Sequence, residues 1–155
     1  FYMLTPAYEI ASCLVGSEMC IRDSSGAKTV IEGCGSNGCE YMTGGVAVIL
    51  GPVGANFGAG MTGGMAYLYD PKKSSGPMMN METLITCKVT VEHWEQELKV
   101  MVQRHLDETA SIKAADILQH WEQEIENFIQ VCPKEMLIHL PEPLAIETTQ
   151  SVPAE

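Results

Sequence analysis

A glycine-rich repeat of 19 residues is the feature that most limits what this chain can fold into. When the chain is shifted by 19 residues, about two and a half copies of the repeat become visible. The identical pairs are Gly35 and Gly54, Asn37 and Asn56, Met42 and Met61, Thr43 and Thr62, Gly44 and Gly63, Gly45 and Gly64, and Ala47 and Ala66. Each copy has a Met-Thr-Gly-Gly corner that leads into apolar, strand-forming residues. Such a unit buries its apolar side chains by stacking on its neighbour, which predicts a solenoid.

The backbone conformation of the corners explains why the repeat contains glycine. Corners need positive φ or a close approach of two chains, and glycine allows both. In stacked coils Met42 would lie above Met61 in the interior. The same 19-residue shift places residues 26–31 over residues 45–50, and we therefore expect stacked coils over residues 25–70.

A dinucleotide-binding motif is the competing interpretation of these glycines. Residues 33–38 have the pattern G-x-G-x-x-G after a strand-like run. That motif binds a pyrophosphate only if a helix begins at its last glycine. Residues 39–45 end in two glycines and form a poor helix, so the pattern favours the repeat. The glycines at 51–58 lack the Lys-Ser/Thr of a phosphate loop.

The second half of the chain has helical periodicity. Residues 71–90 read as a loop or extended connector, residues 91–130 as a helical hairpin, and residues 131–155, which contain four prolines, as an irregular tail. The short link at 107–110 predicts that the two helices pack antiparallel. The apolar positions are Trp94, Leu98, Met101, Val102 and His105 in a helix over about 91–106, then Ala114, Leu118, Trp121, Ile125 and Phe128 after Ser111 as N-cap.

Several side chains within residues 91–130 could take part in chemistry, but we prefer a structural role for each of them. Trp94 and Trp121 could stack on a base or cofactor, but helical spacing beside Leu and Ile favours the core. His105 lies on the apolar face and is interpreted as a packing residue. The glutamates of the second helix are interpreted as a solvated face, namely Glu122, Glu124 and Glu126.

Charge and cysteine content exclude several function classes. The net charge of −11 disfavours binding to nucleic acid and to anionic membranes. No apolar run approaches the roughly 18 residues that would span a bilayer, and we expect a cytoplasmic protein. The cysteines have no C-x-x-C spacing, which favours reduced thiols and no metal site; they are Cys13, Cys20, Cys34, Cys39, Cys87 and Cys132.

Residues 25–135 resemble, in order, the GXGXG domain at the C-terminal end of the glutamate synthase large (alpha) subunit. The resemblance rests on residues 30–45, 48–51 and 56–67, and continues through His105 and residues 114–128 to Pro133 and Lys134. It implies a mainly β fold, a partial right-handed parallel β-helix of about two to three coils, followed by the α-helical hairpin.

The resemblance also implies a function. Enzymes of this family make L-glutamate from L-glutamine and 2-oxoglutarate, with an amidotransferase domain, an FMN-binding barrel and an iron–sulfur cluster. Their GXGXG domain is mainly a structural support. No residue here matches the family's catalytic or cofactor sites, so we assign none: no catalytic, no cofactor-binding and no metal residue. Expected partners are the remaining domains of the large subunit and the electron-donating small subunit; the donor, NADPH, NADH or ferredoxin, stays open.

Two further expectations concern the boundaries of the resemblance. Residues 1–24 do not match the family, and residues 12–24 resemble translated sequencing-adaptor read-through, which predicts a non-native or disordered leader. The alternative function is a free-standing β-helix protein that serves as a supporting subunit, of the kind found in formylmethanofuran dehydrogenase. The helical tail argues against it, because its resemblance is to glutamate synthase.

Overall fold

The computed structural model describes residues 28–145 of the chain. The expected leader at residues 1–24 lies outside them. The strands are β1 (Lys28–Ile31), β2 (Thr43–Ile49), β3 (Gly63–Tyr69), β4 (Leu84–Lys88) and β5 (Phe128–Pro133). The helices are η1 (Gly76–Met78), α2 (Glu92–Thr109), α3 (Ile112–Gln119), α4 (Trp121–Glu124), η2 (Ile125–Asn127) and η3 (Lys134–His139).

The strands form one mixed sheet in the order β1-β2-β3-β5-β4. β1, β2 and β3 are parallel, whereas β5 is antiparallel to both β3 and β4. The expected partial β-helix and mainly β class are therefore wrong. A β-helix needs several strands in each coil, but each repeat here supplies one strand and a connection made of turns. Across residues 28–145 the fold is an open five-stranded sheet with helices, in the mixed α/β class.

The repeat is nevertheless visible in the backbone conformation. Left-handed residues recur at the 19-residue spacing, in the pairs Asn37 (φ 62°) and Asn56 (59°), Cys39 (55°) and Gly58 (70°), Tyr41 (53°) and Gly60 (64°), and Gly45 (82°) and Gly64 (84°). The two connections thus follow the same path through space. Most of these positions hold glycine or asparagine, and asparagine is the residue that tolerates this region best after glycine.

The equivalent connections are joined by backbone hydrogen bonds. Each bond links one repeat to the next: Cys34 N to Pro52 O at 3.0 Å, Asn37 N to Ala55 O at 2.8 Å, Gly54 N to Gly35 O at 3.2 Å, Gly58 N to Gly38 O at 2.8 Å and Tyr41 N to Ala59 O at 2.8 Å. The second connection is bonded in the same way to the chain that follows β3. The N–H of Phe57 donates to Met78 O at 2.8 Å, and its carbonyl accepts from Asn80 N at 3.0 Å. The turns therefore satisfy their backbone groups as strands do.

Such close contact requires glycine at particular positions. A Cβ added to Gly51 would lie 1.7 Å from Glu32 O, and one added to Gly54 would lie 2.5 Å from the backbone of Gly35 and Ser36. Gly35, one repeat earlier, has no atom within 4 Å of the same point. Glycine is thus a steric requirement at Gly54 and not at its equivalent.

The register of the β1–β2 strand pair differs from the 19-residue shift of the repeat. Val30 lies opposite Val48, 18 residues on, and not opposite Ile49. Between β2 and β3 the 19-residue spacing holds from Val46 onward, but Thr43 pairs with Gly63 across an irregularity. One residue of slip moves a side chain to the other face of a sheet. The glycine alignment therefore described the turns well and the first strand pair incorrectly.

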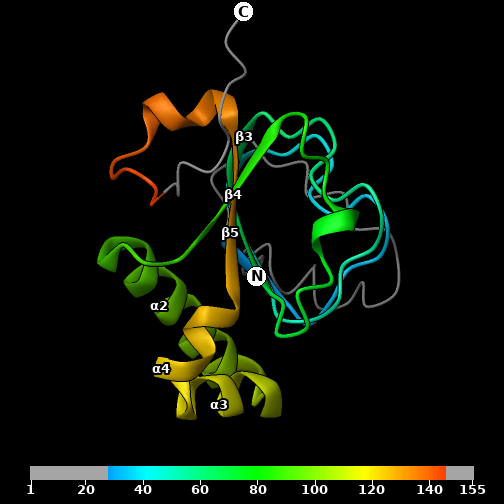
Figure 1. Ribbon diagram of the computed structural model, residues 1–155. Coiled ribbons are helices and arrows are strands. Elements are labelled where there is room, and N and C mark those ends of the chain that lie inside the picture. The colour runs from blue at the N-terminus through cyan, green and yellow to red at the C-terminus, as the bar shows by residue number, and fades with distance from the viewer. Residues whose placement is uncertain (1–27, 146–155) are drawn as a thin grey trace, which may run out of the picture.

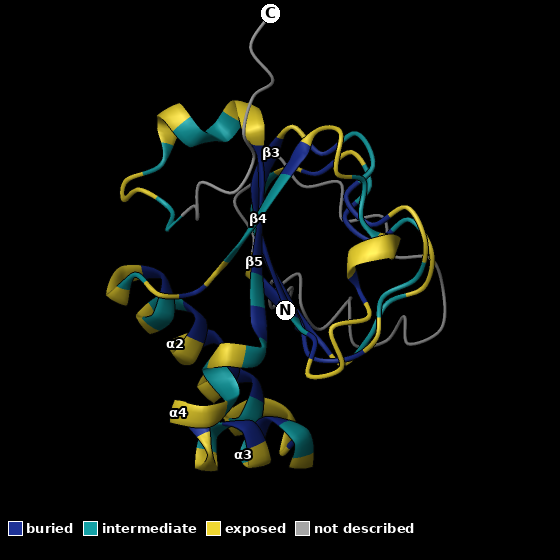
Figure 2. Ribbon diagram, viewed as in Figure 1, coloured by how far each residue is buried: buried dark blue, intermediate teal, exposed yellow. Residues whose placement is uncertain are grey.

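Both faces of the sheet are buried (Figures 1 and 2). Figure 1 shows α2, α3 and α4 on one side and the glycine-rich connections on the other. The core against the helices contains Val30, Val48, Leu50, Met65, Tyr67, Trp94, Leu98, Met101, Val102, Ala114, Ile117, Trp121, Phe128 and Cys132, among others. The core against the connections contains Ile31, Cys39, Met42, Ala47, Ile49, Phe57, Met61, Ala66, Leu68, Leu84 and Val131. Figure 2 shows the strands as the most buried part of the fold.

The expected hairpin over 91–130 is also wrong, because these residues contain α2, α3, α4 and η2 and not two helices alone. α2 continues to Thr109, into the loop expected at 107–110, and α3 ends at Gln119. After α4 and η2 the chain forms β5, which inserts between β3 and β4. The apolar spacing through Phe128 is helical, but that residue begins β5 and pairs with Tyr69, because the pairing of β5 with β3 and β4 outweighs local periodicity. Ser111 is the N-cap of α3 as predicted, since its Oγ accepts from Ala114 N at 3.1 Å.

Asp70 organises the turn that follows β3. Its buried carboxylate accepts hydrogen bonds from Ser74 N at 3.0 Å, Ser75 N at 2.7 Å and Ser75 Oγ at 2.5 Å. Burial raises the pKa of the Asp70 carboxyl, but the hydrogen bonds from Ser75 and Ser74 outweigh it, and the net pKa is lowered. The ionised carboxylate therefore stabilises this turn.

We expect Gly54→Ala to lower the free energy of unfolding by about 1–3 kcal/mol, because the new methyl group would overlap backbone of the neighbouring repeat. Gly35→Ala is the matched control at the equivalent position and should change the same quantity by less than about 0.5 kcal/mol. Denaturant titration followed by fluorescence of Trp94 and Trp121 measures both. Equal effects of the two substitutions would contradict the steric argument.

We expect Asp70→Asn to cost about 1–3 kcal/mol at neutral pH, since hydrogen bonds to a charged acceptor are lost. A carboxyl whose folded pKa is lowered stabilises the fold above its unfolded pKa and loses that contribution as the pH falls through its folded pKa. The difference between the two proteins should therefore be complete well above the reference value of 3.8 and narrow below it. Stability curves at several pH values measure this, and a pH-independent difference would refute it.

Candidate functional site

Glu32 joins three elements of the fold at one carboxylate. It follows β1 directly, and its Oε1 accepts a short hydrogen bond from Ser111 Oγ, the N-cap of α3. His105 of α2 places its Nε2 3.5 Å from the same oxygen. The Ser111 bond, followed by the His105 ring and the Lys113 charge, lowers the pKa of Glu32 despite the opposing effect of burial. This carboxylate is therefore ionised and holds the α2–α3 corner against the end of β1.

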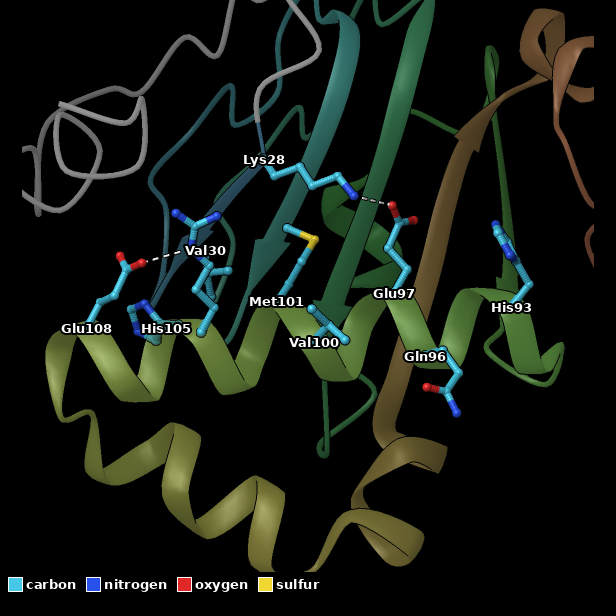
Figure 3. A pocket seen from close by; sticks show the side chains of 10 residues that line it. Lys28, Val30, His93, Gln96, Glu97, Val100, Met101, His105 and Glu108 are labelled. Atoms are coloured by element: carbon cyan, nitrogen blue, oxygen red, sulfur yellow. Dashed lines mark hydrogen bonds and ion pairs between the residues drawn. The ribbon is translucent and has the colours of Figure 1, made fainter. Parts of the chain in front are cut away.

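His105 is the most unusual polar side chain of this corner. Only 7% of it is exposed, and apart from the 3.5 Å contact of Nε2 with Glu32 neither ring nitrogen makes a hydrogen bond to the described residues. Its helix runs beside β1, and between them lies a groove of about 470 Å³. The groove is lined by Met101 and His105 of α2 and by Val30 of β1, all of which Figure 3 labels. The sequence interpretation of His105 as a residue on the apolar face is confirmed, although its ring nitrogens are not satisfied as a packed histidine usually requires.

A second polar group closes the opposite part of the groove. Lys28 of β1 donates from Nζ to Glu97 Oε1 of α2 at 2.7 Å, as the dashed line in Figure 3 marks. Behind Glu97, the Tyr67 hydroxyl is fully buried. Burial first, and then the charge of Glu97, raise the pKa of Tyr67, so the phenol stays protonated. These groups fix α2 on the sheet and offer no free base.

A third cluster lies at the far end of the helical layer. Glu124 accepts hydrogen bonds from Tyr69 Oη at 2.6 Å and Asn127 Nδ2 at 2.8 Å, and the Tyr69 bond is the main cause of its lowered pKa. The prediction of a solvated glutamate face is thus right for Glu122 and Glu126, which are exposed, but not for Glu124.

The tryptophans are core residues, as predicted. Trp94 is 4% exposed and Trp121 6%, and both belong to the core between helices and sheet. The indole of Trp121 donates to Glu95 Oε1 at 2.8 Å. A stacked base or cofactor ring would have no free face to reach at either position.

The dinucleotide motif at 33–38 does not form a phosphate site. The residues after its last glycine form turns and then β2. Two of its amides are already used, Cys34 N by Pro52 O and Asn37 N by Ala55 O. A phosphate needs those amides to be free at a helix N-terminus. The repeat interpretation is therefore the one that the geometry supports.

The four thiols that the structure describes are buried or half-buried. Burial raises the pKa of Cys34 and Cys39, and raises the pKa of Cys87 and Cys132 to about 11 in each case. Within residues 28–145, no three His, Cys, Asp or Glu side chains gather in a way that could hold a metal ion.

Sequence reasoning missed Glu32 as an organising residue. Glu32 and Ser111 are 79 residues apart, and no motif connects them. The only available signal was the N-cap pattern at Ser111, which locates the end of a helix but not its distant partner.

Comparison with known proteins places the chain in a family. The family model described as the GXGXG motif matches residues 3–134, and so reaches into residues 1–24, which we expected to lie outside the resemblance. Similar curated proteins include the glutamate synthase [NADPH] large chain of Azospirillum brasilense, 49% identical over 94% of this chain and 10% of that protein. The ferredoxin-dependent glutamate synthase of Pyropia yezoensis is 40% identical over 85% of this chain and 8% of that protein.

The glutamate synthase [NADPH] large chain of Bacillus subtilis is 40% identical over 86% of this chain and 9% of that protein. The chain thus spans about a tenth of the curated relatives that it matches. Within the described residues, no helix is both long and apolar enough to cross a bilayer. The matched motif, the ordered glycine repeat and these relatives agree that the chain belongs to the GXGXG family, as a segment of the glutamate synthase kind.

Proposed function

We propose that this chain is a structural, non-catalytic segment of a glutamate synthase large chain, an enzyme that makes L-glutamate from L-glutamine and 2-oxoglutarate. The observation that carries the proposal is the match of 94% of this chain to 10% of a glutamate synthase large chain at 49% identity. The remaining nine-tenths of such a protein offer ample room for the reaction centres.

The electron donors named in the relatives support a structural role. The same segment is similar to proteins named for NADPH, for ferredoxin and for NADH, at 49%, 40% and 38% identity respectively. Similarity to proteins of all three names fits a role that they have in common. We therefore propose that other parts of the large chain take part in choosing the electron donor and in contacting a small subunit.

The interior of the segment supports the same role. Its polar clusters are used internally: Glu32 binds Ser111, Glu97 binds Lys28 and Glu124 binds Tyr69. Each pair joins the helical layer to the sheet. With both faces of the sheet buried, the segment is a rigid body that can hold neighbouring domains at a defined distance.

The cofactors of the whole enzyme belong elsewhere in this proposal. FMN and an iron–sulfur cluster would lie in the remainder of the large chain, since no group of three metal-binding side chains gathers within residues 28–145 and the glycine-rich amides are used in hydrogen bonds between repeats. The partners of the segment are then the other domains of the large chain, in the cytoplasm.

We expect Glu32→Gln in the intact large chain to leave kcat for glutamate synthesis within about twofold of wild type. The substitution weakens the charged hydrogen bond from Ser111, worth roughly 1–3 kcal/mol, and should speed amide hydrogen exchange at the start of α3 by about tenfold. Glu122→Gln, at an exposed position of α4, should change neither quantity.

Steady-state kinetics and peptide-level hydrogen exchange on the same preparations test this. A loss of kcat of tenfold or more with normal hydrogen exchange would show that Glu32 takes part in the chemistry. That result would overturn the non-catalytic assignment.

A further inference from the structure

Two methionines are exposed on the segment 76–82, which forms a third layer on the glycine-rich connections. Met78 is 39% exposed and Met81 45%, whereas methionine is among the residues that proteins most often bury. Figure 2 shows η1, which ends at Met78, as exposed beside the connections. Four other methionines of the described residues are at most 6% exposed, namely Met42, Met61, Met65 and Met101.

The backbone of this segment is held at both ends. Met78 O accepts a hydrogen bond from Phe57 N of the second connection at 2.8 Å. Lys134 donates from Nζ to Met81 O at 3.4 Å and to Glu82 O at 2.8 Å. These bonds use only backbone atoms of the segment. The side chains of Met78 and Met81 can therefore change chemically while the layer stays attached.

The other methionines near the connections face the interior. Met79 lies between the two exposed methionines, is half-buried and packs against the core under the connections. Met42 and Met61 are buried within that core. An oxygen atom added to either buried sulfur would have to be accommodated among apolar side chains, which is costly, whereas water can solvate it on Met78 or Met81. The fold thus permits sulfur oxidation at two positions and opposes it at others.

Peroxides convert a methionine thioether into a sulfoxide. The sulfur attacks one peroxide oxygen, the O–O bond breaks and an S=O bond forms; the sulfur loses two electrons, and hydrogen peroxide is reduced to water. The product is polar, and methionine sulfoxide reductases return it to the thioether. Lys134 can donate to the product at position 81, because an ammonium has three N–H groups and the carbonyls of Met81 and Glu82 use two.

We propose that Met78 and Met81 form a site of reversible oxidation by hydroperoxides, which changes this exposed layer from apolar to polar without opening the core. The proposal goes beyond the proposed function and does not rest on it, since the exposure and the contacts of these methionines carry it.

Peptide mass spectrometry of the intact large chain after a short exposure to hydrogen peroxide tests the proposal. We expect sulfoxide to form at Met78 and Met81 at least tenfold faster than at Met42 and Met61, and at similar rates at all four in denaturant. Met79 is the matched control within the same stretch of chain, and should be oxidised more slowly than both of its exposed neighbours. Native rates at Met78 and Met81 as slow as those at Met42 and Met61 would overturn the proposal.

Two further readouts separate oxidation from unfolding. Oxidation confined to Met78 and Met81 should leave the Tm unchanged, and a methionine sulfoxide reductase should restore the unmodified peptide masses. The double variant Met78→Leu, Met81→Leu should lose the fast phase of oxidation and keep the slow phase at Met42 and Met61. A Tm that falls in step with oxidation at the exposed methionines would also overturn the proposal. None of these readouts uses activity, so the kcat of Glu32→Gln tests the proposed function separately.

Discussion

Hydrogen bonds between the backbones of equivalent glycine-rich turns are the interaction on which the rest of this structure depends. Turns normally satisfy their polar groups with water or with side chains. Here the amide of Gly54 donates to Gly35 and that of Gly58 to Gly38, so one turn forms the hydrogen-bonding surface for the next. Neighbouring repeats approach so closely that a single Cβ added to Gly51 would overlap the carbonyl oxygen of Glu32. The turns thus hold the parallel strands beside one another, although the β1–β2 pair is shifted by one residue from the repeat of the turns.

The helices are attached to the sheet at a few polar points around an apolar centre. Trp94, Leu98 and Val102 fill the interface, and the pairs from Glu32, Glu97 and Glu124 lie around it. Each of these carboxylates is bonded to a residue far away in the chain. Hydrophobic contact supplies the stability of this layer, whereas the polar pairs determine where α2, α3 and α4 lie. A segment built in this way is suited to holding other domains in place.

Local patterns located several features correctly. The repeat identified the left-handed turn positions, since Asn37 and Asn56 or Gly45 and Gly64 need the same conformation wherever the chain folds. Ser111 was found as an N-cap, and Trp94 and Trp121 as core residues, because capping and amphipathic spacing act over a few residues. The patterns failed for Phe128, which has helical spacing but lies in a strand, and for the pairing of Val30. For the candidate site at Glu32, the only local pattern was the N-cap at Ser111, which does not reveal its distant partner.

The sequence by itself therefore determined the glycine turns, the starts of α2 and α3 and the family. Those features depend on steric and hydrogen-bonding preferences within about one repeat. Only the tertiary structure decided that β5 completes the sheet between β3 and β4, that the sheet stays open, and that Glu32 meets Ser111 and His105. The physical reason is that strand pairing and buried polar contacts join residues distant in sequence. Their energy depends on which surfaces remain uncovered after the local elements have formed.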